Sequence, residues 1–144
     1  MTASRRLRVV IVDDERDTVA TLREILALEG HEVVGANSAP EAIRHIRRQP
    51  PDAVLVDINM PGISGYEVAR EVRRLYGAVA PRLLAISGTC TGQTDRMLSK
   101  LAGFDHFLEK PCDPQVVIAL LGLLRSETPT PVVSLTEDTV VPEE

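Results

Sequence analysis

Short apolar runs alternate with helix-like segments from residue 7 to residue 125, and this alternation restricts the possible folds more than any other feature. The runs are rich in Val, Ile, Leu and Ala and predict strands at residues 7–12, 33–34, 53–57, 82–86 and 104–109. Apolar residues at helical spacing follow each run and predict a helix after every strand. Such alternation favours right-handed crossovers and a parallel sheet with helices on both faces. We therefore expect an α/β fold of the (βα)5 type, a doubly wound five-stranded parallel sheet.

Serine and glutamate residues three positions apart mark the starts of two predicted helices. Ser38 precedes Glu41, and Ser64 precedes Glu67, in the pattern of a capping box. The predicted fourth helix, which begins at about residue 91 or 93 and ends at 102, has a thin apolar stripe. We expect this helix to be the least firmly held of the set.

The two ends of the chain differ in composition from the part between them. The 144 residues are enough for one domain, which we place at residues 7–125. We expect residues 1–6 to form a loose basic leader and residues 126–144, rich in Thr, Pro, Val and Glu, to form a mostly disordered acidic tail. The initial Met and the short acidic end favour a stand-alone protein, with a fragment of a longer chain as the alternative.

Charge, cysteine content and hydropathy exclude several classes of protein. The net charge of -5 argues against nucleic acid as a direct partner, because phosphate binding needs a basic surface. Cys90 and Cys112 are too few for a disulfide framework and lack the spacing of metal ligands. The apolar run after the basic N-terminus is too short for a signal peptide or a membrane span. We expect a cytoplasmic protein that has no membrane partner.

Polar residues stand where the predicted strands end on the carboxyl side, namely Asp13, Asp14, Asp57, Ser87 and Lys110. The first and third strands of a doubly wound sheet are typically neighbours at the switch point, which brings the three carboxylates together. Like charges raise the pKa of each carboxyl group, and a bound divalent cation relieves the repulsion. Oxygen ligands of this kind suit Mg²⁺, with Mn²⁺ as a substitute.

These residue types together are those that phosphoryl transfer needs. Asp57 would attack phosphorus and form an acyl phosphate, while the metal ion and Lys110 neutralise charge on the phosphoryl oxygens. Ser87 would donate a hydrogen bond to the bound group. Taken singly, Asp13 and Asp14 could be helix-start acids and the other residues could be ordinary turn or surface positions. Their placement at the ends of separate strands in one sheet favours the chemical interpretation.

The same residues identify a family resemblance that covers roughly residues 7–125. The chain resembles the receiver domain of two-component response regulators, in the CheY-like superfamily. The motifs are the acid pair Asp13-Asp14, the segment Asp57-Ile58-Asn59-Met60-Pro61-Gly62, then Ser87 and Lys110-Pro111. The resemblance implies a flavodoxin-like sheet with strand order 2-1-3-4-5.

The resemblance also implies a role for each residue of the cluster. Asp57 would be the phosphoacceptor and would receive the phosphoryl group from a sensor histidine kinase or a phosphotransfer protein. Asp14 and Asp57 would bind Mg²⁺ through their side chains. Asn59 would add its backbone carbonyl, and Asp13 would act through water. Lys110 would contact the phosphoryl group.

Further positions match the family's conformational switch. Ser87 and Phe107 correspond to the switch hydroxyl and the switch aromatic residue. Asn59 and Thr89 match positions that influence how long the phosphoryl group survives. The Lys110-Pro111 peptide bond is expected to be cis.

The output implied by the resemblance is control of partner binding and not catalysis on an external substrate. A second acid two residues after Asp57 would favour an aspartyl-phosphate phosphohydrolase, but Asn59 occupies that place and cannot donate an acidic proton. Receivers often pair through the fourth helix, fifth strand and fifth helix, so a homodimer of that kind is a further expectation. The downstream protein is not identified by the sequence.

Overall fold

A single parallel sheet forms the centre of the computed structural model, which describes residues 6–60, 64–77, 81–87, 102–110 and 113–125. Its strands are β1 (Arg8–Val12), β2 (Glu32–Ala36), β3 (Ala53–Asp57), β4 (Arg82–Ser87) and β5 (His106–Glu109). They lie in the order β2-β1-β3-β4-β5, and all neighbouring pairs are parallel. The predicted fold class and strand order are confirmed.

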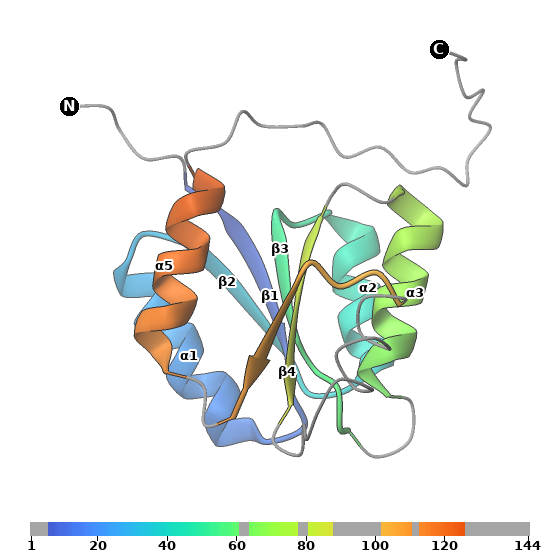
Figure 1. The fold of residues 1–144 in the computed structure, drawn as a ribbon, viewed down its shortest axis with the longest axis horizontal. Helices are drawn as coiled ribbons and strands as arrows, with labels where there is room; N and C mark the ends of the chain where they lie inside the picture. The colour runs from blue at the N-terminus through green and yellow to red at the C-terminus, as the bar shows by residue number, and fades with distance from the viewer. Residues whose placement is uncertain (1–5, 61–63, 78–80, 88–101, 111–112, 126–144) are drawn as a thin grey trace, which may run out of the picture.

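The described helices cover both faces of this sheet (Figure 1). They are α1 (Arg16–Leu28), α2 (Ala39–Arg48), α3 (Gly65–Tyr76) and α5 (Pro114–Arg125). Alternate residues of a strand point to opposite faces, so Val9 and Ile11 pack with α1 and α5, while Val10 and Val12 pack with α2 and α3. Within the described ranges, no helix has both the length and the apolar character that crossing a membrane requires.

Several strand ends differ from the prediction. β2 is longer than expected at both ends, and β5 starts at His106. Phe104, which precedes β5, packs edge-on against Tyr66, with 6.4 Å between the ring centroids. Most of the predicted fourth helix lies at 88–101, outside the described residues.

Ser38 and Ser64 behave differently as helix caps. The Oγ of Ser38 accepts a hydrogen bond from the backbone N–H of Glu41 at 3.3 Å, as predicted. The capping-box prediction for Ser64 was wrong, because its side chain makes no capping hydrogen bond. The N–H of Glu67 instead donates to the backbone carbonyl of Ser64 at 3.0 Å, a tight-turn bond that leaves this donor satisfied without the hydroxyl.

One arginine joins the end of α3 to the segments before β4 and β5. The guanidinium of Arg73 donates to the backbone carbonyls of Gly103, Gly77 and Pro81 and to the carboxylate of Asp105, at distances of 2.8 to 3.3 Å. Burial lowers the pKa of Arg73, and the charge of Asp105 partly opposes this effect. The Asp105 carboxylate also accepts from the N–H of Leu83 at 2.8 Å. A single side chain therefore donates hydrogen bonds to several backbone carbonyls in three separate segments.

Replacing Arg73 with methionine should lower the free energy of unfolding by about 1–2 kcal/mol, because it leaves part-buried carbonyls and Asp105 without this donor. Urea denaturation measures the change. Arg74→Met is the matched control, since Arg74 is exposed and its ion pair within the described residues is with Glu71 on its own helix. Equal stability of the two variants would contradict this role for Arg73.

Candidate functional site

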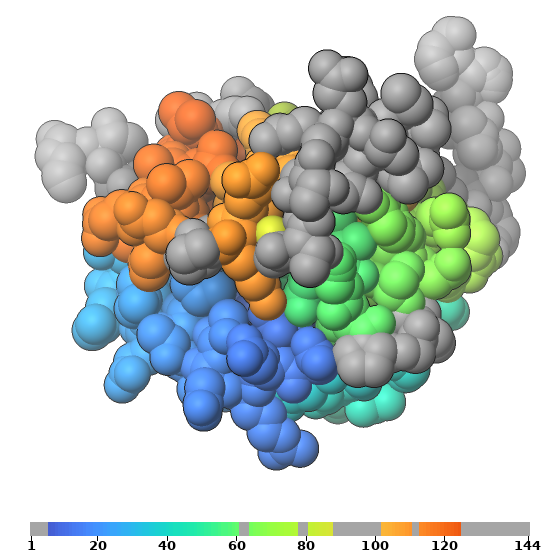
Figure 2. Space-filling model, turned by 60° about the horizontal axis from the view of Figure 1, so that its bottom comes forward, coloured from blue at the N-terminus to red at the C-terminus, as the bar shows by residue number. Residues whose placement is uncertain are grey.

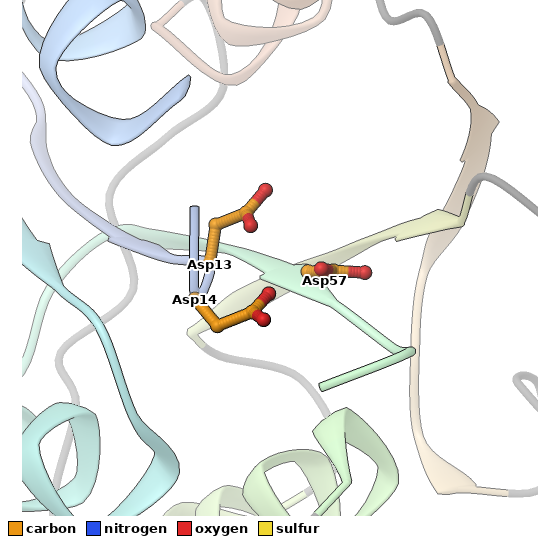
Figure 3. Close-up of side chains that lie close together, drawn as sticks. All are labelled: Asp13, Asp14 and Asp57. Atoms are coloured by element: carbon orange, nitrogen blue, oxygen red, sulfur yellow. The ribbon is translucent and has the colours of Figure 1, made fainter. Parts of the chain in front are cut away.

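Three carboxylates meet at the carboxyl edge of the sheet (Figure 3). Asp13 and Asp14 directly follow β1, and Asp57 is the last residue of the neighbouring β3. One carboxylate oxygen from each residue lies within 4.8 Å of the others. Asp13 and Asp57 are 2% and 3% exposed, whereas Asp14 is open to solvent. Parallel pairing of β1 and β3 is the cause of this convergence, because both strands end at the same edge.

The donor set fits a hard divalent cation. Two buried carboxylates and one exposed carboxylate offer only oxygen atoms, and the exposed one, Asp14, is open to solvent. A cation would also relieve repulsion that the protein compensates only in part. The cluster of Asp13, Asp14 and Asp57 could therefore hold a metal ion.

Lys110 supplies the positive charge that the protein itself contributes to the cluster. Its Nζ lies 3.1 Å from Oδ2 of Asp13 and 3.4 Å from Oδ2 of Asp57. Its backbone N–H donates to the carbonyl of Ser87 at 2.8 Å, which fixes the start of this side chain beside β4. Lys110 thus spans the gap between the end of β5 and the acids of β1 and β3.

The pKa of Asp57 is raised above its ordinary value. Burial is the main cause, and the nearby charge of Asp13 adds to it. A hydrogen bond from the N–H of Asn59, at 3.0 Å, and the charge of Lys110 act in the opposite direction. Burial lowers the pKa of Lys110, but its bonds to Asp13 and Asp57 outweigh burial and raise it overall.

Ser87, Asn59 and Phe107 flank the acids. Ser87 ends β4 and is 3% exposed, with its Oγ 3.4 Å from Oδ1 of Asn59. Phe107 is half-buried in β5, opposite Ala85, and packs against the core between the sheet and the α2–α3 layer. The predicted site residue Thr89 lies outside the described part of the chain.

The Lys110-Pro111 peptide bond also lies outside the described residues, because Pro111 does. The structure brings together Asp13, Asp14, Asp57 and Lys110, with Asn59 and Ser87 beside them. Phe107 stands apart on the next strand.

Sequence reasoning missed Gly65 and a pocket. Gly65 starts α3, and a Cβ at this position would lie 2.5 Å from the backbone oxygen of Asp57. A glycine at a helix start, where it is a poor helix former, was the signal that could have indicated close packing.

A pocket of about 540 Å³ also opens beside Lys110, between the first turns of α1 and α5. Figure 2 looks toward this edge of the molecule.

Asp57→Asn should stabilise the metal-free protein at neutral pH, by on the order of 1 kcal/mol. The pKa of Asp57 is higher in the folded protein than the ordinary value of 3.8 that applies to the unfolded chain. At pH values above 3.8 the unfolded chain therefore binds fewer protons at this group than the folded protein does. The wild type consequently loses stability as the pH rises from 3.8 through the folded-state pKa. The amide removes this loss. Urea denaturation in EDTA at neutral and acidic pH measures both effects. A variant less stable than the wild type at neutral pH would contradict the assignment of an uncompensated charge to Asp57.

Comparison with protein families gives one match that covers most of the chain. Residues 9–122 match the response regulator receiver domain. The chain is 35% identical to the virulence sensor protein BvgS of Bordetella pertussis over 87% of its own length and 11% of that protein. It is 35% identical to the transcriptional regulatory protein PrrA of Mycobacterium tuberculosis, over 94% of its length and 57% of PrrA. The chain thus spans only part of these two relatives.

Shorter relatives and solved structures agree with this match. The chain is 30% identical to protein PilH of Pseudomonas aeruginosa, over 80% of its length and 94% of PilH. A putative response regulator from Chloroflexus aurantiacus superposes with a TM-score of 0.74 at 30% identity, over 85% of this chain and all of that one. The fold is also that of Vibrio cholerae CheY4, with a TM-score of 0.77 over 83% of this chain and 99% of that one. The chain belongs to the response regulator receiver domain family.

Proposed function

We propose that Asp57 accepts a phosphoryl group from a phosphohistidine and that this modification controls the binding of a partner protein. The observation that carries the proposal is the position of Asp57. The residue is 3% exposed and lies at the end of a central strand, and its carboxylate has both a lysine ammonium at 3.4 Å and two further carboxylates beside it. A structural turn residue would need neither the cation nor the acid neighbours.

The reaction is a transfer from nitrogen to oxygen. A carboxylate oxygen of Asp57 forms a bond to phosphorus, the P–N bond to the donor imidazole breaks, and the imidazole nitrogen takes up a proton. Lys110 holds a positive charge next to the attacking oxygen and meets the negative charge of the incoming oxygens.

Bound Mg²⁺, or Mn²⁺ in its place, would neutralise charge on the phosphoryl oxygens. The side chains of Asp14 and Asp57 and the backbone carbonyl of Asn59 would hold it, with Asp13 acting through water. The indirect role of Asp13 is supported by its ion pair with Lys110 at 3.1 Å, which is shorter than the 3.4 Å contact between Lys110 and Asp57.

Phosphorylation would act on the end of β4 and on β5. Ser87 would turn toward the phosphoryl oxygens, and Phe107 would rotate in the space that this opens. Asn59 and Thr89 would influence the lifetime of the acyl phosphate, and the Lys110-Pro111 bond would be cis. The hydroxyl of Ser87, 3.4 Å from Asn59, supports a connection between β4 and the β3 end.

The partners follow from this function. A sensor histidine kinase or phosphotransfer protein would supply the phosphoryl group, and an unidentified protein would read the switch, in the cytoplasm and without direct contact with nucleic acid or membrane. Pairing of two copies would use the expected fourth helix, which precedes β5, together with β5 and α5. We place the receiver unit at residues 7–125, either alone or within a longer hybrid kinase or regulator.

An aspartyl-phosphate phosphohydrolase is the alternative activity, and one experiment separates it from a receiver. The full chain is incubated with Mg²⁺ and phosphoramidate, a small donor with a P–N bond, and intact mass and free phosphate are followed together. We expect one phosphoryl group per chain, which is lost slowly and does not form in EDTA. Rapid, continuous phosphate release from the donor would favour the hydrolase, and an unchanged mass without phosphate release would contradict both.

A further inference from the structure

The excess negative charge of this chain lies entirely in one segment. Of the 21 acidic residues, five are in residues 126–144, at positions 127, 137, 138, 143 and 144, and that segment contains none of the 16 basic residues. Residues 1–125 therefore hold 16 acidic and 16 basic residues and have no net charge. The acidic segment, residues 126–144, is therefore joined to a part of the chain that has no net charge. Basic surfaces of that part are available to the segment.

The basic residues of the body are gathered on α2 and α3. These adjacent helices hold six arginines and three glutamates, and they lie side by side on one face of the sheet (Figure 1). The exposed members define what we call the arginine face, which consists of Arg44, Arg47, Arg48, Arg70 and Arg74. The other two described helices hold no comparable cluster.

Internal ion pairs hold part of the arginine face in place. Glu71 forms an ion pair with Arg47 at 3.6 Å across the helix pair and accepts hydrogen bonds from Arg74 on its own helix. The hydrogen bonding of Arg74 and the charges of both arginines lower the pKa of Glu71. Tyr76 donates from its hydroxyl to the carbonyl of Ile46 at 3.2 Å, which links the C-terminal turns of the two helices. The ion pair between Arg47 and Glu71 and the hydrogen bond of Tyr76 therefore join α2 to α3, the two helices that carry the arginine face.

Within the arginine face, Arg44 and Arg48 remain available to bind an anionic group. Both are exposed on α2 and form no ion pair with any residue of the described ranges. Arg48 stands in the last turn of α2, where the helix dipole favours a positive charge. A ligand with several carboxylates spaced along an extended chain would match this arrangement.

The acidic segment can reach the arginine face. α2, α3 and α5 all run antiparallel to the strands, so the end of α5 at Arg125 lies at the same edge of the sheet as the ends of α2 and α3 (Figure 1). Glu137 and Asp138 follow Arg125 by 12 and 13 residues. An extended stretch of that length spans roughly 40 Å, which exceeds the diameter expected of a domain of this size.

We propose that residues 126–144 bind intramolecularly to the arginine face through their carboxylates. A tether of this length gives an effective concentration in the mM range, so weak exposed ion pairs suffice to populate the bound form. The contact is electrostatic and is therefore lost at high ionic strength. It would shield the arginine face from other anionic molecules. The proposal is independent of the phosphoryl chemistry at Asp57, because no residue of that site takes part.

Paramagnetic broadening of amide signals tests the proposal on the full chain. Cys90 and Cys112 are changed to serine, and a nitroxide is attached to a cysteine introduced at Ser134. At about 0.01 M salt, where the Debye length is about 30 Å, we expect the amides of α2 and α3 to lose roughly half of their intensity. At about 1 M salt, where the Debye length is about 3 Å, we expect recovery. Broadening that is unchanged by salt would overturn the proposal.

Charge variants and a mixing control complete the test. Arg44→Glu with Arg48→Glu should abolish the broadening, whereas Arg16→Glu with Arg23→Glu on exposed positions of α1 should leave it in place. Removing four of the five negative charges of the segment by Glu137→Gln, Asp138→Asn, Glu143→Gln and Glu144→Gln changes no residue of the folded body and should also abolish the broadening. Broadening centred on α5, or broadening of an unlabelled isotopic copy mixed with the spin-labelled protein, would contradict intramolecular binding to the arginine face.

Discussion

Replacing Lys110 with methionine slows the phosphorylation of Asp57 by at least about 10²-fold, at saturating Mg²⁺ and a fixed concentration of acetyl phosphate. The Nζ of Lys110 is 3.4 Å from the carboxylate that attacks phosphorus, and no other basic side chain of the described residues forms an ion pair with that carboxylate. Loss of one preorganised group that stabilises developing charge typically costs about 10²–10³ in rate. Stopped time courses followed by intact mass measure the rate.

Two controls separate this charge effect from damage to the fold. Lys110→Arg keeps the positive charge and should recover part of the rate, although its planar group cannot reproduce the contacts at 3.1 and 3.4 Å together. Mg²⁺ affinity should not fall in Lys110→Met, because removal of a cation strengthens the attraction of the acids for metal. A methionine variant that is phosphorylated at the wild-type rate would remove Lys110 from the mechanism.

Gly65→Ala destabilises the protein by about 2–3 kcal/mol and moves the start of α3 away from β3. The added Cβ would lie 2.5 Å from the backbone oxygen of Asp57 and 2.8 Å from Cα of Ile58, and neither backbone atom can turn aside. Overpacking of this kind typically costs about 1–3 kcal/mol. Because Gly65 N–H donates to the Ile58 carbonyl at 3.1 Å, the displacement also weakens the bond that fixes the helix next to the phosphoacceptor.

Gly122→Ala is the matched control and should have the opposite sign. Gly122 is exposed in α5, and a Cβ there would meet no atom within 4 Å. Alanine is favoured over glycine in a helix by up to about 1 kcal/mol, so this variant should be more stable than the wild type. Urea denaturation of both variants gives the comparison. If Gly65→Ala also stabilised the protein, the close approach of α3 to β3 would be refuted.

The sheet and the acid cluster were predictable because each depends on local pattern and topology. Strand runs with a polar residue at the carboxyl end place Asp13, Asp14 and Asp57 at one edge as soon as β1 and β3 are neighbours. Fully buried strands such as β3 read as continuous apolar runs, so their bounds were clear. Exposed or half-buried edge strands such as β2 and β5 were placed less accurately, since their pattern is weaker.

Contacts between distant segments could not be predicted from local pattern. Ser64 fits a capping box by spacing, but whether its hydroxyl or its carbonyl meets the N–H of Glu67 depends on how the first turn of α3 packs on β3. The contacts of Arg73 with Gly103 and Asp105 join positions about 30 residues apart and have no signature in either segment. Such features follow from the assembled fold and not from the elements.

The most direct test of the account compares the wild type with Asp57→Asn and Asp52→Asn after incubation with acetyl phosphate and Mg²⁺. Asp52 is a matched control, because it is a half-buried acid beside the opposite end of the same strand, where it accepts from the N–H of Arg8 at 2.8 Å. Intact mass should show one added phosphoryl group on the wild type and on Asp52→Asn, and none on Asp57→Asn or in EDTA. A phosphoryl group on Asp57→Asn at the wild-type level would contradict the assignment of Asp57 as the phosphoacceptor.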